Sequence, residues 1–169
     1  MSMVLLAILF TVGAFGQESK LWRENNPSVW GSWKDGWQVA LFSEKQGFYT
    51  DERVEIRIDG RNGSSRSLKV KVGKYPWEKA HFEVRRLGDQ QPLRPKPSPP
   101  MGGGSVKSID PGKTVTFGVL NLLELYDLPP GTYTITATCG FEHQNRLENP
   151  KLEDAKVTSN PITISIIRR

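Results

Sequence analysis

The sequence has little of the side chains that carry most enzymatic and metal chemistry. Its 169 residues include one cysteine and two histidines. Cys139 and His143 supply at most two ligands, whereas a zinc site needs three or four protein ligands in a closed geometry. No nucleophile elbow, phosphate-binding loop, dinucleotide fingerprint or His-Glu-x-x-His motif occurs. These absences predict a protein that is not an enzyme and that holds neither a cofactor nor a metal.

A single cysteine excludes an internal disulfide, so the core must be held together by packing. Cys139 shares the parity of Tyr133, Ile135 and Ala137 in an alternating run, which directs its sulfur inward. A free cysteine in such a place behaves as a small hydrophobe. A reactive thiol needs an electropositive, partly exposed position instead. We therefore expect a structural role for Cys139.

Runs of basic residues are also missing. The formal net charge is +5, but the lysines and arginines are scattered among 18 acidic residues, and the clusters at residues 85–86 and 168–169 are only pairs. Nucleic-acid binding needs a basic stripe on one face. The sequence predicts no nucleic-acid partner.

Long apolar runs are absent as well, and the apolar run at residues 4–10 is too short to span a bilayer as a helix. Residues 1–16 contain no charged side chain, and Ala14 and Gly16 are small residues at the two positions that a signal peptidase reads. This pattern predicts a secretory signal peptide at residues 1–16 and a protein exported to the periplasm, the envelope or the medium, with no transmembrane segment in the mature chain. The alternative is a buried first strand.

The chain is rich in alternation between polar and apolar residues, most clearly at residues 130–139 and 159–166. Side chains on a strand point to opposite faces with a period of two, so each run buries one face. The period is broken between Asn121 and Tyr126, which predicts a short helical turn. Shorter alternating runs lie at residues 37–43, 54–58, 68–72, 81–87 and 115–119, and a weaker run lies at residues 105–109. Seven to nine such strands are typical of an all-β, immunoglobulin-like antiparallel sandwich.

The distribution of the alternating runs predicts the domain organisation of the chain. We expect a tryptophan-rich segment at residues 17–36 and one β-sandwich domain at residues 37–169. Within the sandwich, residues 90–104 are rich in proline and glycine and have too few N–H groups to join a sheet. We expect a surface loop there, inserted between strands, and a polar, hairpin-like loop from about Gly140 to Ser159.

Short motifs resemble a known group of domains. Residues 35–41, 48–56 and 61–62 resemble the opening half of immunoglobulin-like domains in exported bacterial proteins of uncharacterised function. The closing half of those domains is similar to residues 109–112, 122–128, 130–133 and 159–162. These motifs are turns and core positions, and Asp51 stands where the pattern has glycine. The resemblance implies a fold and an exported location, and it implies no active site.

A looser similarity connects the Pro-Gly-x-Tyr pattern at residues 130–133 to the intracellular proteinase inhibitor family. Tyr133 resembles the tyrosine of a tyrosine corner, in which the phenol bonds to the backbone a few residues upstream. This role is structural.

Tryptophan is the best candidate for a binding surface. Four of the five tryptophans lie between Trp22 and Trp37, and exposed indoles stack on sugars or anchor protein partners. We name Trp30, Trp33 and Trp77 as candidate binding residues. The alternative is that Trp30, Trp33 and Trp37 cap the open end of the core, because tryptophan is usually well buried.

The sequence thus favours a non-catalytic exported module for protein interaction or structural support. One alternative is a carbohydrate-binding module, which requires two or more exposed, coplanar tryptophans. Another is a proteinase inhibitor that acts through an exposed, extended loop within residues 90–104. The partner is an unknown protein or carbohydrate.

Overall fold

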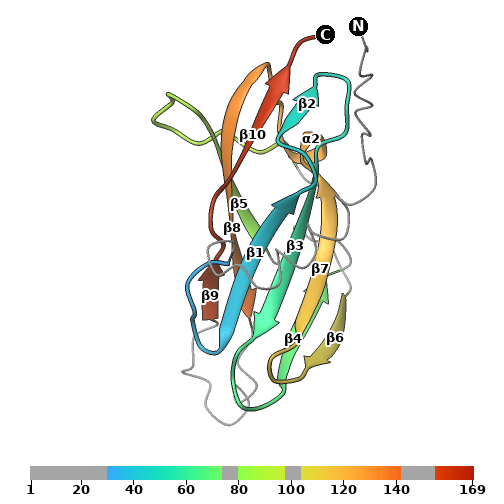
Figure 1. Ribbon diagram of the computed structural model, residues 1–169, viewed down its shortest axis with the longest axis vertical. Coiled ribbons are helices and arrows are strands. Elements are labelled where there is room, and N and C mark those ends of the chain that lie inside the picture. Colours follow the sequence, from blue (N-terminus) through green and yellow to red (C-terminus); the bar gives the residue numbers. More distant parts are fainter. Residues whose placement is uncertain (1–29, 74–79, 98–103, 142–154) are drawn as a thin grey trace, which may run out of the picture.

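The computed structural model describes residues 30–73, 80–97, 104–141 and 155–169 (Figure 1). The expected signal peptide, Trp22, Trp77 and His143 lie outside these residues. The described part of the chain contains ten strands and one short helix, α2 (Leu122–Leu125). The strands are β1 (Trp37–Ser43), β2 (Gly47–Tyr49), β3 (Glu55–Asn62), β4 (Leu68–Gly73), β5 (Ala80–Arg86), β6 (Gly104–Ile109), β7 (Thr114–Asn121), β8 (Gly131–Phe141), β9 (Ala155–Thr158) and β10 (Ile162–Ile167).

Two sheets form the sandwich that the alternation predicts. One has the order β1-β3-β7, and the other has the order β2-β10-β8-β5, with β9 also paired to β8. Neighbouring strands are antiparallel except for β2, which runs parallel to β10. Strands β4 and β6 pair in a separate two-stranded antiparallel sheet at one end of the molecule (Figure 1). The all-β class and the sandwich architecture are therefore confirmed.

The inward faces of the strands match the predicted periodicity. Trp37, Val39 and Leu41 of β1 face the core, as do Phe82 and Val84 of β5. On β8, alternate residues from 133 to 141 are buried. The short helix α2 lies within residues 121–126, where the break in the period of two predicts a helical turn. The Asn121 side chain caps this helix by accepting a hydrogen bond from the Leu123 N–H.

Two strands were not predicted. Strand β2 has only three residues, which is too short for alternation to be visible. Strand β9 occupies residues 155–158, where a polar loop was expected, so that expectation was wrong for these residues. Strands β9 and β10 pair with successive parts of β8, so together they form one strand position that is interrupted at residues 159–161.

Ser159 and Pro161 explain this interruption. The Ser159 N–H donates to the Ala137 carbonyl at 2.8 Å, and the Ala137 N–H donates back to the Ser159 hydroxyl at 3.0 Å. The hydroxyl thus takes the place of a backbone acceptor. Pro161 has no N–H to donate. Regular pairing with β8 resumes at Ile162.

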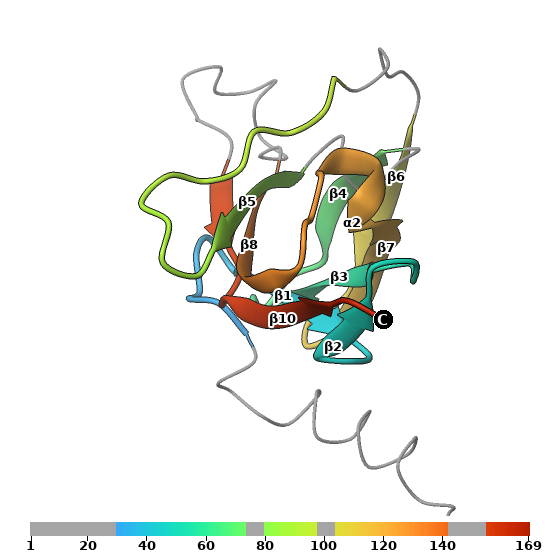
Figure 2. The ribbon, with the colours of Figure 1, turned by 90° about the horizontal axis from the view of Figure 1, so that it is seen from above.

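The open sides of the sandwich differ. On the β5 side, residues 88–97 cross from β5 to α2, and the Leu93 N–H donates to the Val84 carbonyl while the Lys96 N–H donates to the Leu125 carbonyl, both at 2.7 Å. These residues contain no strand, as expected of the proline-rich loop, but they are fixed at both points. On the opposite side β1 and β10 lie next to each other (Figure 2).

Candidate functional site

The tryptophans occupy three different environments and do not form one cap over the core. Trp37 is buried in the core and stacks on Phe141, with ring centroids 4.4 Å apart. Trp30 is also buried, but it belongs to a separate cluster with Ala40 and Phe42, whose side chains alternate with the inward residues of β1. Trp33 is 51% exposed. Of the three proposed binding residues, Trp30 is therefore internal, Trp33 is accessible, and Trp77 is outside the described residues.

Trp33 rests on the backbone of Gly63. A Cβ atom built on Gly63 would clash with Cη2 and Cζ3 of the indole, so the six-membered ring lies directly against the glycine. Gly63 does not have a positive φ. It is thus the space for the indole, and not an unusual backbone conformation, that requires glycine at this position.

Asn62 holds the turn on which Trp33 rests. Its side chain is fully buried, and its amide nitrogen donates to the carbonyl oxygens of Ile109 at 2.7 Å and of Arg66 at 2.9 Å. Its amide oxygen accepts from the Ser64 N–H at 2.9 Å and from the Ser64 hydroxyl at 2.8 Å. Residues 62–64 match an N-glycosylation sequence, but this amide is already engaged on both atoms.

Three loops meet at this end of the molecule, the lower end in Figure 1. The Gly63 N–H donates to the Gly36 carbonyl at 2.9 Å, and the Gly112 N–H donates to the Asn62 carbonyl at 2.7 Å. We call this region, formed by residues 33–36, 61–67 and 110–113, the loop end.

The loop end carries an excess of unpaired positive charge. Its four basic side chains are Lys34, Arg61, Arg66 and Lys113. Within the described residues, none of them forms an ion pair with a carboxylate. It has two carboxylates, Asp35, which is exposed, and Asp110, which accepts a hydrogen bond from Ser67 at 2.7 Å. The three loops of the loop end thus carry an exposed indole together with an excess of basic over acidic side chains.

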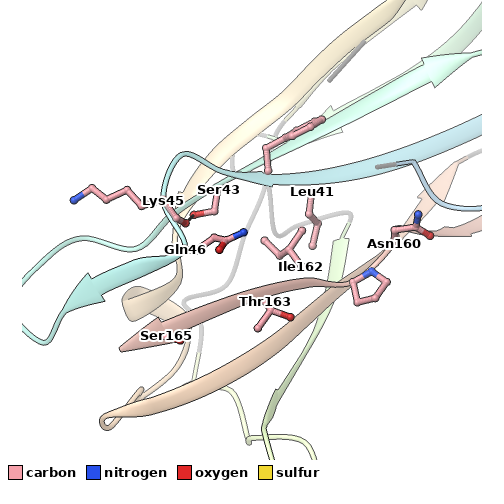
Figure 3. A pocket seen from close by; sticks show the side chains of 10 residues that line it. Leu41, Ser43, Lys45, Gln46, Asn160, Ile162, Thr163 and Ser165 are labelled. Carbon is pink, nitrogen blue, oxygen red and sulfur yellow. Dashed lines mark hydrogen bonds between the residues drawn. The ribbon is translucent and has the colours of Figure 1, made fainter. Parts of the chain in front are cut away.

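A second feature lies at the other end of β1. A cavity of about 460 Å³ opens between β1 and β10, and we call it the β1–β10 groove (Figure 3). Leu41 and Ile162 point toward one another inside it, and Gln46 reaches in from the chain that follows β1 (Figure 3). The lining is completed by Phe42, Ser43, Lys45, Asn160, Pro161, Thr163 and Ser165.

Backbone groups face the groove from both strands. The Ser165 N–H donates to the Gln46 carbonyl at 2.7 Å, so this residue points away from β8. Strand periodicity then directs the N–H and C=O of Thr163 to the same side. Strand β2 pairs only with residues 165–167, and no described strand pairs with Thr163 on the side away from β8. On the facing strand β1, the Val39 carbonyl accepts a hydrogen bond from the Gly31 N–H. Because of strand periodicity, the backbone groups of Leu41 and Ser43 point to the same side of β1 as those of Val39.

Cys139 and Tyr133, two side chains singled out from the sequence, are both buried in the core. Burial raises the pKa of the Cys139 thiol to about 12, which disfavours the reactive thiolate. Among the described residues no group of three or more His, Cys, Asp or Glu side chains is arranged to hold a metal. The Tyr133 hydroxyl donates to the carbonyl oxygen of Pro129, which is the bond of a tyrosine corner.

Sequence reasoning singled out Trp33 but missed the β1–β10 groove. The groove is made of strand edges, and edges depend on which strands pair. The only sequence signal for it is Pro161, which cannot donate to a sheet and marks a break.

The comparisons with known proteins do not identify a family. No family model matches the chain, and no curated protein matches it. One solved structure that resembles it is described as a novel β-glucosidase, EmGH1, from Erythrobacter marinus, with a TM-score of 0.42 and 15% sequence identity over 78% of this chain and 15% of that chain. No helix in the described residues is long and apolar enough to cross a membrane.

Proposed function

We propose that this protein is a non-catalytic binding module that takes up an extended segment of a protein partner in the β1–β10 groove. The observation that carries the proposal is the groove itself, about 460 Å³ in volume, with strand edges on both sides. Export of the protein is part of the proposal and is supported by the sequence of residues 1–16.

An extended segment suits the groove because of its backbone groups. An uncovered strand edge offers N–H and C=O groups that pair with a further strand. In β-strand addition, main-chain hydrogen bonds supply affinity and pockets for alternate side chains supply specificity. Thr163 offers both backbone groups on one side, and the edge at Leu41 and Ser43 faces it. The apolar contact of such a segment would be chiefly with Ile162, because Leu41 at the base of the groove is only 1% exposed.

The test is a selection from a library of random peptides displayed against the protein, followed by binding measurements on three proteins. Thr163→Pro removes the N–H that faces the groove but leaves the pairing of Ile162 and Ile164 with β8. Thr163→Ala keeps the N–H and removes only an exposed side chain, so it is the matched control. We expect selected peptides to bind the wild type and Thr163→Ala alike and Thr163→Pro at least about tenfold more weakly.

Hydrogen exchange gives the second readout. Peptide binding is expected to slow exchange of the Thr163 N–H. Equal binding to Thr163→Pro and the wild type, or a failure to select any peptide, contradicts the proposal. Thermal unfolding of Thr163→Pro shows whether the variant is folded, and the exchange result on the wild type decides the question if it is not.

Carbohydrate binding is the second candidate, and the observation that favours it is the exposed Trp33 braced on Gly63. Within the described residues it would use a single indole, because Trp30 and Trp37 are buried. Proteinase inhibition is the third candidate. Residues 90–97 are mostly exposed, and the remainder of that loop includes residues 98–103, which lie outside the description.

A further inference from the structure

We infer that the loop end is a binding site for an acidic polysaccharide, with Trp33 as the platform for one sugar ring and the surrounding basic side chains as partners for its carboxylates. The inference deepens the carbohydrate candidate and rests on it. It is independent of the β1–β10 groove, which lies at the other end of β1.

Trp33 has the geometry of a platform. One part of its ring is fixed by Gly63, so little side-chain entropy remains to be lost on binding. About half of its surface is accessible. An indole in this state offers a large flat apolar area to the C–H face of a sugar ring. The turn beneath it is held by the four hydrogen bonds of Asn62.

The charges select the class of sugar. The three loops carry the basic side chains Lys34, Arg61, Arg66 and Lys113. None of these forms an ion pair with a carboxylate among the residues that the structure describes. Set against Asp35 and Asp110, the region has an excess of two positive charges (four minus two). Uncompensated surface charge attracts ligands of opposite sign. A neutral glycan would leave these charges unused, whereas uronic acids place a carboxylate on each ring.

A polysaccharide fits better than the other acidic polymers. Single-stranded nucleic acid is bound by a positively charged groove along which successive bases stack on several aromatic side chains. In the described part of the loop end there is one aromatic platform. An acidic peptide would match the charges, but it has no flat ring face on each residue to stack on the indole. Both polymers serve as outcomes of the test.

The experiment titrates the purified protein with oligomers of a uronic acid, such as alginate oligosaccharides, and follows tryptophan fluorescence and binding heat. We expect saturable binding that weakens as salt is raised, because exposed charges are screened by salt. Trp33→Ala is expected to weaken binding at least about tenfold, as is typical of an aromatic anchor. Lys34→Gln with Arg66→Gln is expected to weaken it severalfold and to reduce the dependence on salt.

Gly63→Ala is the sharpest variant, because it leaves every binding side chain in place and only displaces the indole. We expect it to weaken binding about as much as Trp33→Ala does. Gly140→Ala is the matched control, since a Cβ there meets no atom within 4 Å. Arg168→Gln, an exposed side chain beyond the end of β10 and outside both proposed sites, is the control for charge. Both controls are expected to bind like the wild type, and thermal unfolding checks that each variant is folded.

Four results would overturn the inference. Equal binding of the wild type and Gly63→Ala would show that the indole platform is not used. Tighter binding of oligothymidylate or polyglutamate than of the uronic acid would assign the charges to another polymer. Binding of neutral oligosaccharides alone, dependent on Trp33, would refute the acidic class but keep the carbohydrate candidate, whereas no binding of either glycan class would refute both.

Discussion

Replacing Asn62 with alanine is expected to unfold the turn beneath Trp33 and to lower the stability of the whole domain. The Asn62 side chain makes four hydrogen bonds, two donated and two accepted. The bond to the Ile109 carbonyl is buried, whereas the bonds to Arg66 and Ser64 lie nearer the surface. Loss of the bond to the Ile109 carbonyl is therefore expected to lower the free energy of unfolding more than loss of each of the other three bonds.

The magnitude follows from these environments. A hydrogen bond contributes about 1 kcal/mol net, and a buried polar atom left without a partner costs about 1–3 kcal/mol. Water can replace the amide at Arg66 and Ser64 but not at the Ile109 carbonyl. We expect Asn62→Ala to lower the free energy of unfolding by about 3 kcal/mol, within about 2–4 kcal/mol. For a domain of this size the melting temperature would fall by about 6–12 °C.

Urea unfolding with linear extrapolation measures this free energy. Ser43→Ala is the control, because its hydroxyl also bonds to a backbone carbonyl, that of Lys45, but at an exposed site. It is expected to change stability by less than about 0.5 kcal/mol. A loss below about 1 kcal/mol for Asn62→Ala would refute the role assigned to the amide.

Asn62→Asp separates hydrogen bonding from shape. It keeps the size and the accepting oxygen, but it places a carboxylate against the Ile109 and Arg66 carbonyls. Burial raises the pKa of such a carboxyl above its unfolded value, so its stability is highest at low pH and is lost as the pH rises through the folded-state pKa. Relative to the wild type, this variant is expected to gain stability between pH 7 and pH 4, whereas Asn62→Ala is not.

Further expectations concern the core and the strand break. Tyr133→Phe removes the bond to the Pro129 carbonyl and should lower the free energy of unfolding by about 1 kcal/mol in the same urea assay; an unchanged midpoint would argue against the tyrosine corner. Ser159→Ala leaves the buried Ala137 N–H without its acceptor and should cost about 1–3 kcal/mol, and a neutral effect would show that the backbone at the break rearranges. The pKa of Cys139 is raised to about 12 by burial, so the neutral thiol favours the folded state below the unfolded pKa and this contribution is lost as the pH rises toward 12. Native protein at pH 8 should therefore react with a disulfide reagent only as fast as it unfolds, and rapid labelling of the folded protein would contradict the burial of the thiol.

The sequence predicts most of the fold because each long strand carries its own periodicity. Strand β8 alternates over eleven residues, and the inward parity of Tyr133 and Cys139 follows from it directly. Strand β2 has no such signal, since three residues do not define a period. Strand β9 was missed because the break at residues 159–161 hides its continuity with β10.

The sites were less predictable, because each depends on contacts between distant segments. Nothing in the local sequence distinguishes Trp30, which is buried against Phe42, from Trp33, which is half exposed on Gly63. The distinction arises from the antiparallel bridge between Trp30 and Ala40, which places Trp30 against the sheet. Residues 33–36 then turn back into β1 and leave Trp33 at its end.

The two candidate sites arise by different means at opposite ends of β1, and each therefore serves as the control for the other. The β1–β10 groove exists because β2 is short and Pro161 interrupts the neighbouring strand, so no strand among the described residues pairs with these backbone edges. The loop end exists because a buried asparagine fixes a turn that carries side chains. Thr163→Pro should weaken peptide binding and leave glycan binding intact, whereas Gly63→Ala should weaken glycan binding and leave peptide binding intact. If either variant abolished both activities, the effect would have to act through the shared sandwich, and neither surface could be assigned from that variant.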